Sequence, residues 1–98
     1  MVIVAGWMDV AEEERDAFLA SRLEAMLKTR DEPGCLEYVF SPDPINPRRV
    51  RLFELWGSRA DLDVHLGVMR ARPAPAQTIA VIERSVEVYE TSAAESLG

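Results

Sequence analysis

The spacing of hydrophobic residues predicts a strand and then a helix in the first third of the chain. Residues 2–8 form a continuous apolar run with β-branched side chains, which is typical of a strand covered on both faces. Residues 11–30 predict an amphipathic helix, because hydrophobic residues recur there at helical spacing and form one stripe: Phe18, Leu19, Leu23, Met26 and Leu27. Asp9 and Glu12 predict a variant of the capping box at its start, and the Pro-Gly pair at 33–34 predicts the turn that ends it.

Two further strands are predicted on either side of a proline-rich loop. Residues 35–41 alternate and place three large apolar side chains on one face: Leu36, Tyr38 and Phe40. Prolines at 42, 44 and 47 exclude regular pairing between the strands. Residues 50–57 also alternate, with Val50, Leu52, Glu54 and Trp56 on one face and Arg51, Phe53 and Leu55 on the other. Because both faces mix polar and apolar groups, we expect one to pack on helices and the other to meet a second subunit.

A capped helix and a last strand complete the pattern. Ser58 and Asp61 predict a capping box, and the helix after it carries one apolar stripe: Leu62, Leu66 and Met69. His65 lies beside that stripe. Pro73 and Pro75 are expected to end the helix, and residues 76–82 are compatible with another helical turn or two. Residues 84–91 alternate again and predict a strand, followed by a small, polar tail over 92–98 that we expect to be frayed.

The predicted order is strand, helix, strand, strand, helix, strand, which is the split βαβ arrangement of ferredoxin-like domains. We therefore expect an α+β fold of type βαββαβ, in which a four-stranded antiparallel sheet carries both helices on one face. Residues 1–91 would form a single domain. Pairing two such sheets face to face would bury the apolar residues of the uncovered face. A chain of 98 residues buries a limited fraction of its surface alone, so a dimer would enlarge its hydrophobic core.

Composition narrows the possible partners. The net charge is −6 and Lys28 is the only lysine, which argues against a nucleic-acid partner. One cysteine cannot form an intrachain disulfide, so nothing indicates an oxidising compartment. The apolar start is too short to span a bilayer and has no positive residues before it. We expect a cytoplasmic protein that contacts neither nucleic acid nor membrane, and most naturally a homodimer.

Three residues are the main candidates for chemistry. His65 is the only histidine; a histidine on the apolar flank of a helix can take a proton from an acidic phenol or quinol. Glu54 and Trp56 lie two apart on one strand face, so a carboxylate and an indole point into the same space. A desolvated carboxylate has a raised pKa suited to proton transfer. The alternatives are a partly exposed histidine without a role and a core tryptophan beside a structurally bonded glutamate.

Other residues are weaker candidates. Tyr38 and Tyr89 can contribute hydroxyl groups to a substrate pocket, yet both are ordinary strand residues. Arg51 belongs to the densest basic cluster, and an inward-pointing arginine would require a partner such as Glu37 or a ligand. Cys35 is more readily explained by packing than as a nucleophile. A single histidine restricts metal ligation, and no run of residues suggests a metal site.

The chain resembles the antibiotic biosynthesis monooxygenase (ABM) domains. The resemblance rests on three segments in the family's order and spacing: Glu-Pro-Gly-Cys-Leu at 32–36, Phe-Glu-Leu-Trp at 53–56 and Leu-Asp-Val-His-Leu at 62–66. It implies a dimeric α+β barrel. It also implies an oxidoreductase that uses no cofactor and oxidises an electron-rich quinol, anthrone or polyketide-like aromatic with O2. In that chemistry His65 would be the base. Trp56 and Tyr38 would form the wall of the substrate pocket and supply a hydrogen-bond donor, and Glu54 would orient the reacting groups.

Other functions remain open on the same scaffold. The related haem-degrading domains use an asparagine on the first strand, whereas the only asparagine here is Asn46 in the proline-rich loop, so haem breakdown is less favoured. A dimeric module that binds a small ligand or regulates, without chemistry, is the main alternative. Isomerisation, haem handling and degradation of a small signalling molecule are further alternatives.

Overall fold

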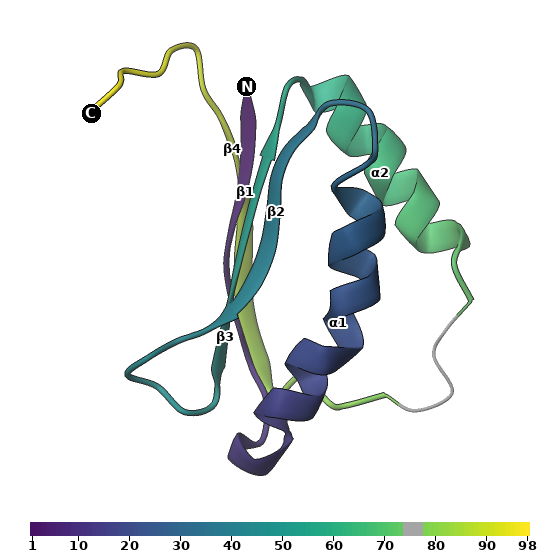
Figure 1. Cartoon of the computed structure of the whole chain (residues 1–98), viewed down its shortest axis with the longest axis vertical. Coiled ribbons are helices and arrows are strands. Elements are labelled where there is room, and N and C mark those ends of the chain that lie inside the picture. Colours follow the sequence, from purple (N-terminus) through teal and green to yellow (C-terminus); the bar gives the residue numbers. More distant parts are fainter. Residues whose placement is uncertain (74–77) are drawn as a thin grey trace.

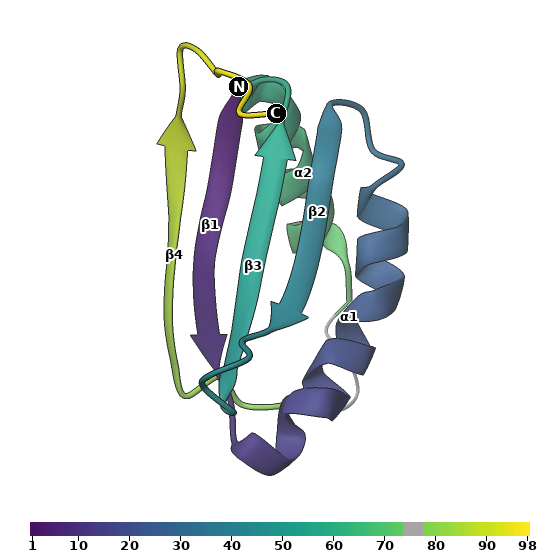
Figure 2. The ribbon, with the colours of Figure 1, turned by 60° about the vertical axis from the view of Figure 1, so that its left-hand side comes forward.

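The protein is a four-stranded antiparallel sheet with two helices on one face. The computed structural model describes residues 1–73 and 78–98 (Figure 1). The elements run β1 (Val2–Asp9), a 3-10 turn η1 (Glu12–Glu14), α1 (Arg15–Thr29), β2 (Cys35–Pro42), β3 (Arg49–Trp56), α2 (Arg59–Ala71) and β4 (Glu83–Glu90). The strand order is β2-β3-β1-β4, and Figure 2 shows α1 beside β2 with α2 behind the sheet. This confirms the predicted α+β, ferredoxin-like βαββαβ fold.

The register of the strands fixes which residues face the helices. Val2 pairs with Trp56, Val4 pairs with Glu54, and Tyr38 pairs with Glu54 from the other side. Successive side chains alternate between faces, so these residues share the helix-covered side. The buried apolar core lies on that side and between the helices: Val2, Val4, Val10, Phe18, Tyr38, Phe40, Val50, Leu52, Trp56 and Leu62. Tyr38, Glu54 and Trp56 are therefore buried beneath the helices.

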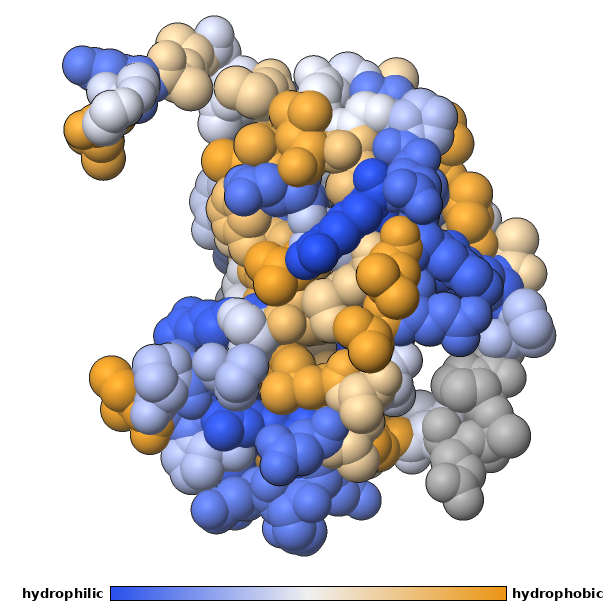
Figure 3. Space-filling model, in the orientation of Figure 1, coloured by the Kyte–Doolittle hydropathy of each residue, from blue (hydrophilic) through white to orange (hydrophobic). Residues whose placement is uncertain are grey.

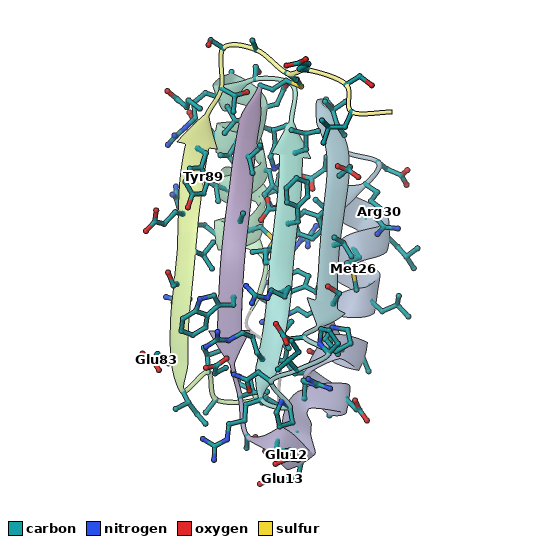
Figure 4. All side chains as sticks on the ribbon, turned by 90° about the vertical axis from the view of Figure 1, so that its left-hand side faces the viewer. Glu12, Glu13, Met26, Arg30, Glu83 and Tyr89 are labelled. Atoms are coloured by element: carbon teal, nitrogen blue, oxygen red, sulfur yellow. The ribbon has the colours of Figure 1, made fainter. Side chains whose placement is uncertain are left out.

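The opposite face of the sheet has no helix over it. The register places on it a set of largely apolar, partly exposed side chains: Ile3, Ala5, Trp7, Val39, Phe53, Leu55 and Tyr89. Figure 4 looks onto this face, with Tyr89 labelled on β4, and Figure 3 shows its side of the molecule hollowed between the C-terminal tail and the β2–β3 loop. Neither α1 nor α2 nor any other helix among residues 1–73 and 78–98 has the length and apolar character needed to cross a membrane.

The first helix differs from its prediction at the start and along its stripe. A 3-10 turn precedes α1, and Asp9 makes no cap because its carboxylate holds Arg49 at 2.9 and 3.0 Å. Leu23 and Leu27 are exposed at 57% and 60%, so the expected five-residue stripe is wrong for these two. α1 lies mainly along the edge strand β2 (Figure 2). The face of α1 that the sheet buries is therefore narrower than the hydrophobic stripe in the sequence predicts.

Two local predictions also fail. The expectation that Leu36 shares a face with Tyr38 is wrong, because a bulge between Cys35 and Glu37 breaks the alternation and leaves Leu36 exposed. The described residues 78–82 contain no helix; the rest of the helical turn expected over 76–82 lies outside the described residues. The Ser58 cap is confirmed, since its hydroxyl accepts the Asp61 N–H at 3.2 Å. Residues 92–98 have no regular secondary structure and are exposed.

Candidate functional site

Four of the candidate residues meet between α2 and the sheet. Trp56 is fully buried, and its indole lies 4.8 Å from the His65 ring, centroid to centroid. The Tyr38 ring lies 5.5 Å from His65 at an edge-on angle of 66°. Glu54 is 6% exposed and accepts a hydrogen bond from Trp56 Nε1 at 2.9 Å. The structure thus brings together His65, Glu54, Trp56 and Tyr38.

Local structure explains why these side chains converge. Glu54 and Trp56 are two apart on β3 and Tyr38 is the cross-strand neighbour of Glu54, so all three point to the helix side. Leu62 and His65 are three apart on α2 and are the two residues of that helix that are buried. His65 is 2% exposed, so the interpretation of a partly exposed histidine is wrong.

The histidine has a partner that the sequence pattern did not indicate. Glu32 Oε2 lies 2.9 Å from His65 Nδ1, although the two residues are 33 positions apart. Glu32 belongs to the turn between α1 and β2, where its N–H donates to Thr29 O and its carbonyl accepts from the Cys35 N–H. A carboxylate on Nδ1 fixes the ring orientation and favours the tautomer whose Nε2 can accept a proton. The only available signal was the Glu-Pro-Gly turn itself, which contains no information on what the side chain contacts.

Burial changes the acid–base behaviour of the two other polar groups. Burial raises the pKa of Glu54, while the hydrogen bond from Trp56 and the positive charge of His65 act in the opposite direction. Burial also raises the pKa of Tyr38 to about 12, with a further contribution from the Glu54 charge. Tyr38 therefore keeps its phenolic proton at any physiological pH and acts as a donor, not as a base.

The pH dependence of stability offers a check on Glu54. Because its folded pKa lies above its usual value near 4.5, the protonated form stabilises the fold, and that contribution is lost as pH rises through the raised pKa. We expect Glu54→Gln to flatten this decline in urea-unfolding free energy as the pH rises above 4.5. Asp43, whose pKa is lowered to about 2 mainly by backbone N–H groups of Asn46 and Ile45, titrates below this window. Equal slopes in the two proteins would contradict a desolvated Glu54.

Arg51 and Tyr89 are not part of this cluster. Both lie on the uncovered face of the sheet, because Arg51 pairs with Trp7 and Tyr89 pairs with Ile3. The expectation of an inward Arg51 is wrong: it is half-exposed and donates to Asp43 Oδ2 at 2.9 Å, not to Glu37. The Tyr89 hydroxyl donates to Glu87 at 3.3 Å and is exposed. Within one chain, neither residue can contact a ligand that lies beside His65.

The remaining candidates have structural roles. Burial raises the pKa of the Cys35 thiol, which disfavours the nucleophilic thiolate, and its Sγ donates to Glu37 O at 3.7 Å. Asn46 lies in the β2–β3 loop, where its backbone carbonyl accepts from Arg15 at 2.9 Å. Among the described residues, no three His, Cys, Asp or Glu side chains are grouped so that they can hold a metal ion.

Comparisons with known proteins agree with the fold. The model of the antibiotic biosynthesis monooxygenase family matches residues 1–70. The chain belongs to this family. An uncharacterized protein, sll1783, from Synechocystis is 34% identical over 64 residues, which cover 65% of this chain and 44% of that protein. The chain thus matches less than half the length of this cyanobacterial relative.

Solved structures of other proteins share the architecture. The crystal structure of a Deinococcus radiodurans protein named for the ABM family superposes with a TM-score of 0.79 at 20% identity, covering 100% of this chain and 99% of that one. The heme-degrader MhuD from Mycobacterium tuberculosis, solved with two hemes in its active site, gives a TM-score of 0.75 at 11% identity, covering 98% and 100%. At these identities the likeness shows the fold alone.

Proposed function

We propose that this ABM-family protein is a cofactor-independent monooxygenase that oxidises an electron-rich quinol, anthrone or polyketide-like aromatic with O2. The observation that carries the proposal is the buried His65, which is paired with the partly buried Glu32 and flanked by the rings of Trp56 and Tyr38. A base in a dry, aromatic-walled site can deprotonate an acidic phenol or anthrone and keep the resulting anion away from water.

In the proposed reaction the substrate itself supplies the electrons that reduce O2. His65 Nε2 takes the proton, and the substrate anion gives one electron to O2, which avoids the spin-forbidden direct reaction. Recombination of the two radicals forms a C–O bond, and the resulting peroxide anion takes the proton back from His65 to give a hydroperoxide. Loss of the hydrogen on the same carbon, with cleavage of the O–O bond, releases water and leaves a carbonyl, so one oxygen atom enters the product. The Tyr38 hydroxyl, which stays protonated, and Glu54 when protonated are donors for the developing oxyanion.

Oxygen uptake by the purified, metal-stripped protein tests this function. The panel comprises hydroquinones, naphthoquinols and anthrones, with product mass measured beside the oxygen trace. We expect uptake that depends on the protein and a product with one added oxygen atom, after allowance for lost hydrogen. No uptake with any member would favour a ligand-binding module without chemistry, and a product of unchanged mass would indicate an isomerase.

The proposed active unit is a homodimer. The uncovered face of the sheet carries Trp7, Val39, Phe53 and Leu55, and a single 98-residue chain leaves them partly exposed. Pairing two sheets through this face would bury them and form the dimeric α+β barrel. Arg51 and Tyr89 would then lie at the subunit interface.

Sedimentation at micromolar concentration checks the assembly. We expect the wild-type protein to be a dimer and Phe53→Glu to be a folded monomer, because a charge on the uncovered face would be buried without a partner. Leu23→Glu is the matched control, since Leu23 is exposed on α1. A monomeric wild-type protein would overturn the barrel.

A further inference from the structure

The β2–β3 loop, residues 43–48, projects beyond the sheet on the side away from the helices. Figure 1 shows the loop extending from the lower end of β2 and β3, opposite α1 and α2, and Figure 3 shows the hollow that it bounds. That side is the uncovered face, which carries the partly exposed Trp7 and Phe53. A second sheet that packs over this face would therefore also meet the loop.

The carboxylate of Asp43 orders the loop from within. It accepts hydrogen bonds from the backbone N–H groups of Ile45 at 2.8 Å and Asn46 at 2.9 Å. It also accepts a hydrogen bond from Arg51 Nε at 2.9 Å. The two backbone N–H groups and Arg51 lower the pKa of Asp43 to about 2, so the carboxylate that holds the turn stays ionised at physiological pH.

Arg15 of α1 holds the same loop from the outside. Its Nη1 lies 2.9 to 3.5 Å from three backbone carbonyl oxygens, those of Asp43, Asn46 and Arg49. Prolines at 44 and 47 restrict the backbone further. A loop that is ordered before it meets a partner loses little conformational entropy on binding.

The ordered loop presents one apolar side chain and one unpaired charge. Ile45 is 91% exposed, although its own N–H is bonded to Asp43. Arg48 is exposed, and its guanidinium forms no ion pair within residues 1–73 and 78–98. Single exposed apolar side chains are common, but this one is held by an ordered loop beside a sheet face that lacks cover.

Charge favours a second copy of the chain as the partner of the loop. Arg51 is neutralised by Asp43, and the other exposed charges on the uncovered face are carboxylates: Glu37, Glu83 and Glu87. In a two-fold pair, each copy would bring the unpaired Arg48 to an acidic sheet of the other.

We propose that the β2–β3 loop docks on a second copy of this chain, with Ile45 as its apolar contact. The inference rests on the proposed homodimer, because the loop overhangs the face that a second subunit would cover. It adds a contact outside the sheet, which each subunit donates to the other.

The dissociation constant of the dimer, measured by sedimentation over a dilution series, tests this contact. We expect Ile45→Ser to raise the constant about tenfold or more, as loss of an apolar interface anchor does. The variant should stay folded by circular dichroism, because Ile45 is exposed in the single chain. Val64→Ser is the matched control and should leave the constant unchanged, since Val64 is 64% exposed on α2, on the opposite side of the sheet.

Arg15→Gln separates the ordering of the loop from the contact itself. It should raise the dissociation constant several-fold although Ile45 is still present, because the loop would then be ordered only on binding. Hydrogen exchange at the Ile45 and Asn46 amides should become faster in the same variant.

A monomeric wild-type protein would overturn the inference together with the proposed dimer. A dimer that Phe53→Glu dissociates but Ile45→Ser leaves intact would keep the sheet interface and overturn the docking of the loop. Equal weakening by Ile45→Ser and Val64→Ser would overturn it as well, since the effect would then not belong to the loop. Oxygen uptake is a separate readout, so uptake without any effect of Ile45→Ser on the dimer would leave the proposed oxidation standing.

Discussion

Replacing His65 by alanine should lower protein-dependent oxygen uptake about a hundredfold or more, the usual contribution of a general base. The imidazole is the group of the cluster best placed to take a proton, because Tyr38 keeps its own proton and burial favours protonated Glu54. Initial rates with the best substrate of the panel measure the effect, on protein checked for its fold by circular dichroism. An uptake rate within a few-fold of wild type would remove His65 from the mechanism.

Two variants separate the role of His65 from general damage to α2. Asp63→Asn is the control, because Asp63 is exposed on the same helix and forms an ion pair with Arg59 at 3.1 Å, away from the cluster. It should leave the rate unchanged. Glu32→Gln should lower kcat more than it changes KM, since Glu32 contacts the imidazole and orients it. A change confined to KM would mean that Glu32 contacts the substrate and not the base.

Replacing Trp56 by alanine should cost about 3 to 5 kcal/mol in the free energy of unfolding. The side chain is fully buried at the end of β3, between Val2 on β1 and Cys35 on β2. Its loss opens a cavity between α2 and the sheet and removes the donor to Glu54 Oε1. Urea unfolding at pH 7 gives the value directly.

Two comparisons make this result specific. Trp56→Phe should cost less, because the ring still fills most of the space and only the indole N–H is lost. Leu97→Ala should be neutral, since Leu97 is fully exposed in the tail. A loss below about 1 kcal/mol for Trp56→Ala would contradict the burial of the ring.

The fold could be predicted from the sequence because its local signals agree with one another. The β-branched run at 2–8, the Ser58 cap and the Pro-Gly turn each specify a boundary by short-range chemistry. Predictions that depended on packing were less successful. Leu23 and Leu27 match a helical stripe, but only the position of α1 against β2 decides how wide the buried face is. The bulge that turns Leu36 outward has no comparable sequence signal.

The same distinction applies to the site. The convergence of Glu54 and Trp56 follows from their two-residue spacing, and the apolar flank placed His65 near the core. Arg51 and Glu54 are three residues apart on β3, so their side chains point to opposite faces of the sheet. The position of Arg51 on the uncovered face could therefore have been predicted from the sequence. The position of Tyr89 depends on the register of β4 against β1. The contact of Glu32 with His65 depends on how the turn after α1 packs against α2. Neither relation is local in sequence.

The turn that carries Glu32 is joined to the segment before α2. Gly34 has a φ of +79°, its carbonyl accepts the Gly57 N–H at 2.8 Å, and a side chain at position 34 would collide with the Asp61 carboxylate. The base and its orienting carboxylate therefore meet across this joint, and opening of the Gly34–Gly57 hydrogen bond would separate them. We expect such opening to inactivate the site reversibly without any change in ligand or protonation. Hydrogen exchange at the Gly57 amide would report how often the joint opens.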